Sequence, residues 1–226
     1  MDSRLELLVG KTNLEKIKDV NVLVVGLGGV GGYVVESLTR SFINSITIVD
    51  KDIVDISNIN RQIIATTKTI GKSKVEAFEN RIREINPSIK VYAYNMEITS
   101  SNIDTIFDKE YDYVIDCVDD IEAKISLIKE CNKRNIKQVI ATGTGKKLDA
   151  SKLYITTLDK TSYDPLAKVL RYKLRKLGIS TKIVCTASKE ESVETTSNVI
   201  PSNSYVPSTA GLLITSYIIN DIINKN

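Results

Sequence analysis

Short apolar runs rich in Val and Ile alternate, over the first two thirds of the chain, with longer segments in which apolar residues recur every three to four positions. The short runs are typical of strands covered on both faces, and the longer segments are typical of amphipathic helices. Strands are predicted at 20–25, 46–49, 90–94, 113–117 and 138–142, and helices at 30–40, 72–86 and 123–135. This alternation predicts an α/β fold with a doubly wound, mostly parallel, Rossmann-like sheet and helices on both of its faces.

The pattern becomes less regular after about residue 148. An apolar run at 153–157 is followed by a basic helical segment at 165–177, a Ser-, Thr- and Glu-rich segment at 186–204 and an apolar helix at 206–223 that polar residues interrupt. We therefore expect a main domain over residues 1–147 and a smaller C-terminal extension over residues 148–226, packed on the same domain.

The composition excludes several classes of protein. Hydrophobic residues make up 42% and charged residues 26% of the 226 residues, which is the balance of a globular protein rather than a disordered one. The chain has no histidine, and this excludes Ser-His-Asp hydrolysis, His-based zinc sites and imidazole acid–base chemistry.

Its three cysteines form no C-x-x-C pair, which favours a reducing compartment. No run of eighteen apolar residues occurs and the N-terminus is charged, so we expect a cytoplasmic protein with no membrane-spanning segment and no secretory signal.

The two halves of the chain differ in charge. Residues 1–120 hold 14 Lys and Arg against 19 Asp and Glu, whereas residues 121–226 hold 17 against 9. The basic half predicts contact with a polyanion, or else a solvated helix face. Its cations concentrate in the predicted helix 165–177, at Lys168, Arg171, Lys173, Arg175 and Lys176.

A glycine motif follows the first predicted strand. Gly26-Leu27-Gly28-Gly29-Val30-Gly31 fits G-x-G-x-x-G, and Asp50 ends the second predicted strand twenty-two residues past Gly28. Backbone amides of such a turn can hold phosphate, and the acid is placed to accept the ribose hydroxyls. The motif alone fits NAD, FAD, S-adenosylmethionine or ATP, and also a tight packing turn with no ligand.

The residues after Asp50 favour a triphosphate. Asp52, Asn58, Arg61, Gln62 and Lys74 follow in order, and an NAD-dependent dehydrogenase needs no such Arg and Lys. Attack on a triphosphate does need them, because the charge on the phosphoryl oxygens must be neutralised in the transition state. Asp119 follows a later strand and could hold Mg²⁺, which favours one or two carboxylates plus phosphates. Taken singly, each of these charged residues could instead form a surface ion pair.

The runs GLGGVGG, VDKDIVDISNINRQ, GKSK and VIDCVDD resemble the ubiquitin-activating-type adenylyltransferases over roughly residues 4–145. The resemblance implies an ATP-binding domain in which Arg61, Lys74 and Asp119 act on the phosphates and Asp119 on Mg²⁺. It also implies a homodimer in which Arg4 reaches the partner's site. The family commonly has Ser at the position of Gly32. The residues that would contact the nucleotide are Gly26, Gly28, Gly29, Gly31, Asp50, Asp52, Asn58, Arg61, Gln62, Lys74 and Asp119.

The second half is similar to the tRNA threonylcarbamoyladenosine dehydratase branch, at 158–161, 164–168, 170–171, 205–208 and 210–211. That similarity implies ATP-dependent cyclisation of the threonylcarbamoyl group on the adenosine beside the anticodon of tRNA, by activation of the threonyl carboxylate. A cysteine that some members have near 205–208 is missing, and Cys185 is expected to be a buried structural residue.

Three alternatives remain open. One is an activator of a ubiquitin-like sulfur carrier in molybdopterin or thiamine synthesis, although such activators usually have a zinc-binding pair of C-x-x-C motifs that this chain cannot form. The others are an NAD-dependent oxidoreductase and a non-catalytic binding module. The resemblance also leaves room for a sulfur-relay partner such as a cysteine desulfurase.

Overall fold

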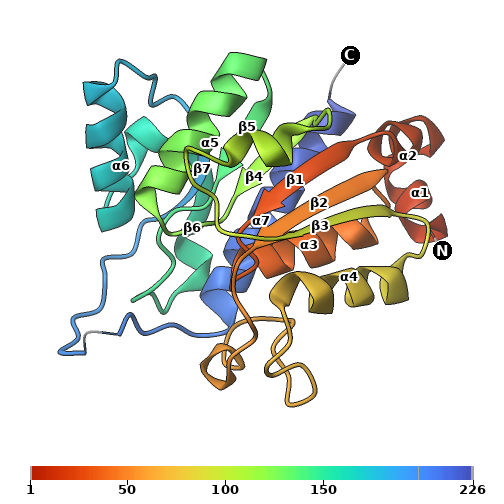
Figure 1. Cartoon of the computed structure of the whole chain (residues 1–226). Coiled ribbons are helices and arrows are strands. Elements are labelled where there is room, and N and C mark those ends of the chain that lie inside the picture. The colour runs from red at the N-terminus through yellow and green to blue at the C-terminus, as the bar shows by residue number, and fades with distance from the viewer. Residues whose placement is uncertain (1, 198, 225–226) are drawn as a thin grey trace.

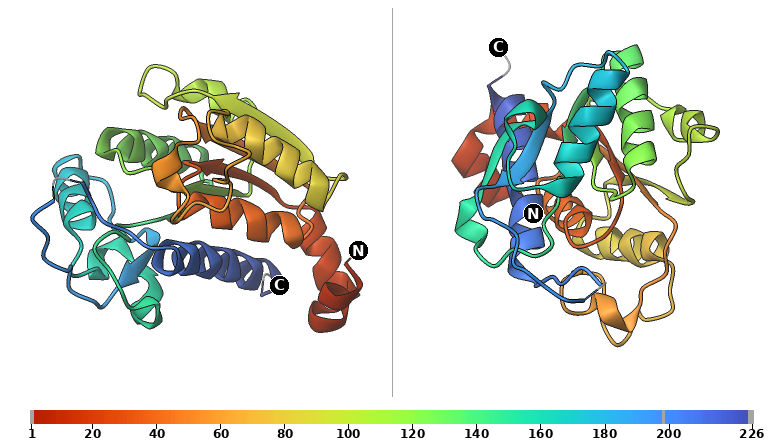
Figure 2. Two further views of the ribbon diagram at one scale, coloured as in Figure 1. Left: turned by 90° about the horizontal axis from the view of Figure 1, so that it is seen from below. Right: turned by 90° about the vertical axis from the view of Figure 1, so that its left-hand side faces the viewer.

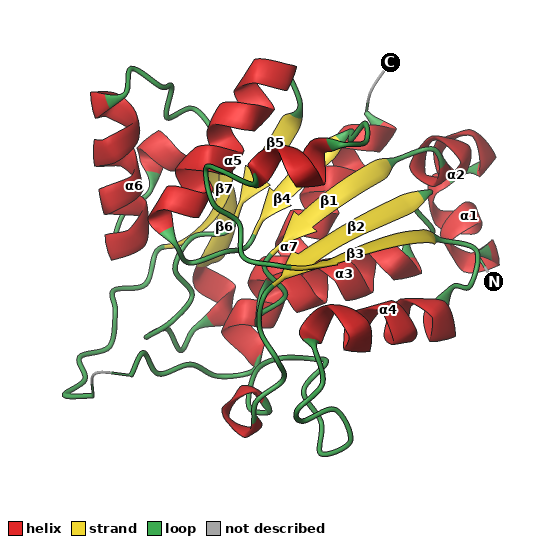
Figure 3. Ribbon diagram, in the orientation of Figure 1, coloured by secondary structure: helices red, strands yellow, loops and turns green. Residues whose placement is uncertain are grey.

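The computed structural model describes residues 2–197 and 199–224, and these form one seven-stranded sheet with helices on both faces (Figures 1 and 3). The strand order is β3-β2-β1-β4-β5-β7-β6, and every neighbouring pair is parallel except β6 with β7. The strands are β1 (Asn21–Val25), β2 (Ser45–Asp50), β3 (Lys90–Asn95), β4 (Tyr113–Asp116), β5 (Lys137–Ile140), β6 (Leu153–Thr157) and β7 (Val184–Ser188). The α-helices are α1 (Ser3–Val9), α2 (Lys11–Lys18), α3 (Gly31–Arg40), α4 (Lys74–Ile85), α5 (Ile121–Arg134), α6 (Pro165–Lys176) and α7 (Tyr205–Ile223).

The central strands are apolar along their whole length because both faces of the sheet are covered. In β1, Val22 and Val24 join the core beneath α3, α4 and α7, whereas Leu23 and Val25 join the core beneath α5. A third cluster packs α6 against α5. Figure 2 shows α7 beside α3 on the first of these faces. The doubly wound, mostly parallel α/β sheet predicted from the sequence is thus confirmed.

Two parts of the fold were not predicted. The strand β7 falls at the start of the segment that the sequence assigns to an irregular Ser- and Thr-rich region, and the helices α1 and α2 precede the first predicted strand. In β7 the residues between Val184 and Ser188 are small or polar, yet they are buried. Burial between β5 and β6, rather than strand propensity, accounts for this element.

The C-terminal part of the chain completes the same sheet and core. Strands β6 and β7 extend the sheet, and Ala210, Ile214 and Ile218 of α7 are fully buried in the main core. Helix α7 is long and apolar enough to cross a membrane by length and composition, and 44% of its apolar stretch is buried inside the protein, where the helix packs on α3. The division of the chain at residue 147 stays a prediction.

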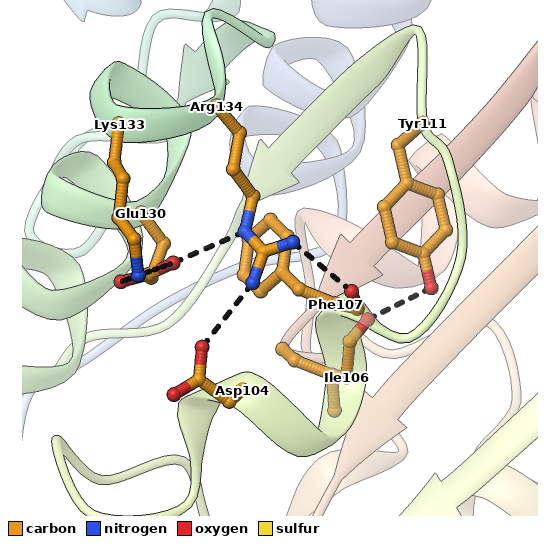
Figure 4. Close-up of polar contacts among 7 residues, drawn as sticks. All are labelled: Asp104, Ile106, Phe107, Tyr111, Glu130, Lys133 and Arg134. Carbon is orange, nitrogen blue, oxygen red and sulfur yellow. Dashed lines mark hydrogen bonds and ion pairs between the residues drawn. The ribbon is translucent and has the colours of Figure 1, made fainter.

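An arginine fastens the connection between β3 and β4 to helix α5. Arg134 donates to the carbonyl oxygen of Phe107 at 3.2 Å and pairs with Glu130 and Asp104 (Figure 4). The hydroxyl of Tyr111 donates to the carbonyl oxygen of Ile106 at 2.8 Å. These bonds hold a connection that has only a short 3₁₀ helix, η2 (Ile103–Phe107), against the sheet.

A buried ion pair joins three elements at the carboxyl ends of the strands. Lys124 of α5 donates to Asp116 of β4 at 3.0 Å and to the carbonyl oxygen of Ala141, just past β5, at 2.9 Å. Both side chains are almost fully buried, at 0% and 2% exposed. Burial raises the pKa of the Asp116 carboxyl, and the Lys124 ammonium opposes that rise.

We expect Lys124→Met to lower the free energy of unfolding by about 3–5 kcal/mol, because it leaves the Asp116 carboxylate buried without a cation. Urea unfolding of the variant measures this loss. The double variant Asp116→Leu with Lys124→Met removes both charges and should recover much of the stability. A single variant as stable as the parent protein would contradict the interpretation.

Candidate functional site

The glycine motif forms a tight turn between β1 and α3 at the carboxyl edge of the sheet. Gly26 has φ +89°, and a Cβ atom there would lie 2.8 Å from the carbonyl of Cys117. A Cβ atom on Gly31 would lie 1.8 Å from the carbonyl oxygen of Gly26. Both positions therefore require glycine for close backbone packing.

Gly28 has a different reason to be glycine. A Cβ atom there would meet nothing within 4 Å, so open space borders the turn at this point. Gly29 faces Pro207 of α7 and the side chain of Arg61. At Gly32, where the related family commonly has Ser, the ring of Phe78 lies 3.0 Å from a Cβ position. Of these glycines, only Gly28 borders space in which a ligand could approach the backbone.

The carboxylate of Asp50 organises the turn. Its Oδ2 accepts a hydrogen bond of 2.6 Å from the backbone amide of Leu27, inside the glycine motif. Its Oδ1 accepts one of 2.8 Å from the amide of Asp52. The side chain is 8% exposed, and each oxygen retains a lone pair for a further donor. Asp50 can therefore hold the turn and accept a ribose hydroxyl at the same time.

Lys74 provides the cation of this cluster. It is the first residue of α4, its side chain is 5% exposed, and Nζ lies 2.7 Å from Asp52 and 3.8 Å from Asp50. The ammonium is thus fixed beside the two carboxylates at the end of β2. The structure brings together the predicted set Asp50, Asp52 and Lys74.

The loop between β2 and α4 carries the remaining predicted residues. Asn58 is buried, and its side chain accepts from the amide of Asp55 at 3.1 Å. Arg61 is half-buried and donates to the carbonyl oxygen of Ser57 at 2.8 Å. The asparagine therefore shapes the loop, and the aliphatic part of the Arg61 side chain lies beside Gly29 of the glycine turn.

Two buried polar atoms in this loop have no hydrogen-bond partner among the described residues. They are Oε1 of Gln62 and Oγ of Ser73, the residue before α4. A buried polar atom without a partner is unfavourable and marks a place where a ligand or water can bind. The open space at Gly28 fits a nucleotide placed along the turn.

Asp119 and Arg4 are both exposed, but they lie in different places. Asp119 follows β4 at the carboxyl edge and makes no hydrogen bond or ion pair with any described residue. The described residues contain no cluster of three metal-ligating side chains, so a cation here would need oxygens from phosphates or water. Arg4 lies on α1, which contacts α2 at the amino end of β1 (Figure 1). It is therefore remote from the glycine turn of its own chain.

All three cysteines are poor nucleophiles. Cys117 lies against the glycine turn, and Cys131 and Cys185 are buried in the cores. Burial raises the pKa of each thiol to about 12. The thiolate, which is the reactive form, is therefore scarce near neutral pH.

The cations of α6 do not act as one set. Arg171 turns inward and donates to Leu158 and Thr161, and Lys173 pairs with Glu122 of α5. Lys168 and Arg175 are exposed and form no ion pair with described residues. Arg171 therefore makes its contacts within the protein, Lys173 stays partly exposed, and contact of this helix with a polyanion stays a prediction.

Two contacts join residues of the C-terminal half to the β2–α4 loop and the glycine turn, and the sequence did not predict them. Asn60 donates to the carbonyl oxygen of Ser202 at 3.1 Å, and Pro207 lies against Gly29. In Figure 1 the described parts of the chain between β7 and α7 lead away from the sheet and back to the start of α7. No local pattern could reveal these pairings, because their partners are about 140–180 residues apart.

Comparisons with known proteins agree on one family. The model of the ThiF family matches residues 2–199. A tRNA threonylcarbamoyladenosine dehydratase of Bacillus subtilis is 40% identical, and the match covers 98% of this chain and 94% of the relative. The match to the Escherichia coli protein of that name is 38% identical and covers 74% of this chain, but only 63% of the relative.

The three-dimensional structure is also similar to that of a tRNA threonylcarbamoyladenosine dehydratase. A crystal structure of the E. coli dehydratase, solved in complex with AMP, superposes with a TM-score of 0.93 at 33% identity and covers 98% of this chain. The family model covers most of the chain, and the B. subtilis relative at 40% identity matches it over almost its whole length. The chain therefore belongs to the ThiF family.

Proposed function

We propose that this chain is an ATP-dependent tRNA threonylcarbamoyladenosine dehydratase. The main support is the match to the B. subtilis dehydratase, which extends over almost the full length of both chains. The site supports it independently, because the glycine turn borders open space and a buried lysine lies beside it. Both features suit a substrate that carries phosphates.

ATP would lie along the glycine turn. The E. coli relative has been crystallised with ATP and with AMP. In this chain the amides around Gly28 would meet phosphate, Asp50 would accept a ribose hydroxyl, and Gln62 Oε1 would gain a hydrogen-bond donor. Asp119 and the ATP phosphates would together hold Mg²⁺, which neutralises charge on the phosphates when it is bound.

The reaction needs activation because a carboxylate is a poor electrophile. An oxygen of the threonyl carboxylate attacks a phosphorus atom of ATP, and the bridging P–O bond at that phosphorus breaks to release pyrophosphate or ADP. An internal N–H or O–H nucleophile of the same substrate then attacks the activated carbonyl carbon and loses its proton, and the phosphorylated oxygen departs with the electrons of its bond to carbon. The product has lost one water, whose oxygen ends on phosphate. Arg61 and Lys74 stabilise the charge on the transferring group, and holding both ends of one substrate supplies much of the rate.

The proposal includes the oligomeric state, which we expect to be a homodimer. Arg4 is remote from its own glycine turn, and Leu7 and Leu8 of the same helix are 87% and 82% exposed. Both features suit a homodimer in which Arg4 completes the partner's site. A sulfur-relay partner such as a cysteine desulfurase stays a prediction, and so does a location in the cytoplasm with the tRNA.

Activation of a ubiquitin-like sulfur carrier is the weaker candidate. The molybdopterin-type relative of Porphyra purpurea matches only 54% of this chain, and the dehydratase of B. subtilis matches 98%.

The decisive experiment incubates the protein with ATP, Mg²⁺ and tRNA that carries threonylcarbamoyladenosine, followed by mass spectrometry of the nucleosides. The dehydratase predicts that the modified nucleoside loses one water and that the loss requires ATP. An unchanged nucleoside, together with ATP-dependent activation of a sulfur-carrier protein, would favour the other candidate.

We expect Arg61→Ala to lower kcat for dehydration by about 10²–10³-fold, since it removes one donor to the transferring phosphoryl group. The free energy of unfolding should change little, because the guanidinium is half-buried and bonds only within its own loop. Arg83→Ala, on the exposed face of α4, is the matched control and should keep full activity. A normal kcat for Arg61→Ala would exclude a catalytic role for this residue.

We expect iodoacetamide at pH 8 to leave the folded protein active and almost unlabelled, because the thiol pKa values are raised to about 12. All three cysteines should react after unfolding in urea. Mass spectrometry counts the labels, and the same samples are assayed for dehydration. Loss of activity in step with a single native label would show that one thiol takes part in catalysis.

A further inference from the structure

Two residues other than glycine adopt the left-handed backbone conformation in loops at the carboxyl edge of the sheet. Of the four described non-glycine residues with positive φ, Phe42 and Asn135 follow the ends of helices, where this conformation is usual. The other two, Lys146 at φ +59° and Tyr163 at φ +54°, lie in loops. Such a conformation is unfavourable for a bulky aromatic residue, and it persists only where neighbouring groups enforce it.

Lys147 is the group that enforces it. This lysine follows Lys146 in the loop after β5, and it is 3% exposed. Its Nζ donates to the carbonyl oxygen of Tyr163 at 3.1 Å and to that of Glu190, which follows β7. Burial lowers the pKa of this ammonium, and the nearby acids Asp164, Glu190 and Glu191 oppose that effect. One buried cation therefore ties three loops together at the carboxyl edge of the sheet.

The chain is also fixed immediately after Tyr163. The carboxylate of Asp164 accepts from the amide of Gly143, after β5, at 2.7 Å, and from the amide of Ala167, in the first turn of α6, at 3.0 Å. Asp164 is itself buried. The backbone of Tyr163 is thus held on both sides, while its side chain stays outside, with the residue 52% exposed.

Lys146 is presented in the same way on the other side of Lys147. Its amide donates to the carbonyl oxygen of Pro201, and its carbonyl oxygen accepts from the amide of Val193. The residue is half-exposed, and its ammonium forms no ion pair with any described residue. The buried lysine therefore lies between an exposed aromatic ring and a cation that has no acidic partner.

We propose that Tyr163 is a stacking platform for an unpaired base of the tRNA next to the modified adenosine, and that Lys146 meets a phosphate of the same strand. This inference rests on the proposed function. It follows from the position of the ring at the carboxyl edge, where the glycine turn also lies, and from the pairing of a ring with a cation. Unpaired bases bind proteins by stacking on aromatic rings while cations hold the backbone.

The strained backbone makes a sharp test possible. Tyr163→Gly removes the ring but suits the positive φ, so the variant should be at least as stable as the parent protein in thermal unfolding. KM for the tRNA should rise roughly five- to a hundred-fold, which is the range for loss of one base–aromatic stack. Tyr163→Phe keeps the ring and should keep the KM. The KM for ATP should not change in either variant.

A tRNA substrate without the stacked base isolates the contact. The nucleotides on the two sides of the modified adenosine are replaced, one at a time, by an abasic residue. One of the two substrates should raise the KM of the parent protein, and Tyr163→Gly should add no further loss with that substrate. Tyr92→Ala, on the edge strand β3, is the control, and its KM for both substrates should equal that of the parent.

Lys146→Gln tests the phosphate contact. It should reduce the slope of log affinity against log salt by somewhat less than one unit, with ATP binding unchanged. An unchanged tRNA KM in Tyr163→Gly, or an equal loss on intact and abasic tRNA, would overturn the platform. Failure of the proposed function looks different, because the parent protein itself would then not dehydrate the modified tRNA.

Discussion

The hydrogen bond between the Asp50 carboxylate and the Leu27 amide is the contact on which the candidate site depends. It joins the end of β2 to the glycine turn, and Lys74 brings the first turn of α4 to the same carboxylate. The turn therefore has its shape before a nucleotide arrives. Preorganised donors stabilise developing charge best because they need not reorient during the reaction. The Asp50 carboxylate that accepts a hydrogen bond from the turn retains lone pairs for a ligand. One side chain can therefore both stabilise the turn and bind the nucleotide.

The parallel topology explains why the candidate residues meet although they are far apart in sequence. Each parallel strand ends at the same edge, so the residues after β1, β2, β4 and β5 become neighbours. Strand β6 is antiparallel and ends at the opposite edge, beside the start of β7, and the connection over residues 158–164 brings the chain back to the carboxyl edge before α6 begins. Residues from the C-terminal half thus reach the nucleotide edge, where Pro207 contacts Gly29.

The sequence was informative where the physics is local. Apolar runs located β1 and β2 because both faces of these strands are buried, and helical periodicity located α3 between them. The glycine motif was recognisable because close packing at Gly26 and Gly31 admits no side chain. Prediction from the sequence failed where a feature depends on residues that are distant along the chain. Strand β7 is stabilised by its neighbouring strands β5 and β6. Arg171 has the sequence pattern of a surface cation, but in the folded chain it donates to Thr161. The roles of Lys147 and Tyr163 depend on loops that only the folded chain brings together.

Among the described residues, the lysines that are buried all lie at the carboxyl edge, and each joins different elements there. Lys74 ties α4 to the end of β2, Lys124 ties α5 to β4 and β5, and Lys147 ties three loops. This edge accumulates carboxylates and strand-end carbonyl oxygens, and an unpaired oxygen in a buried position is costly. A buried ammonium offers three donors and compensates for several such oxygens at once. The edge is consequently rigid and less negative than its acidic residues alone would make it, which is what an anionic substrate requires.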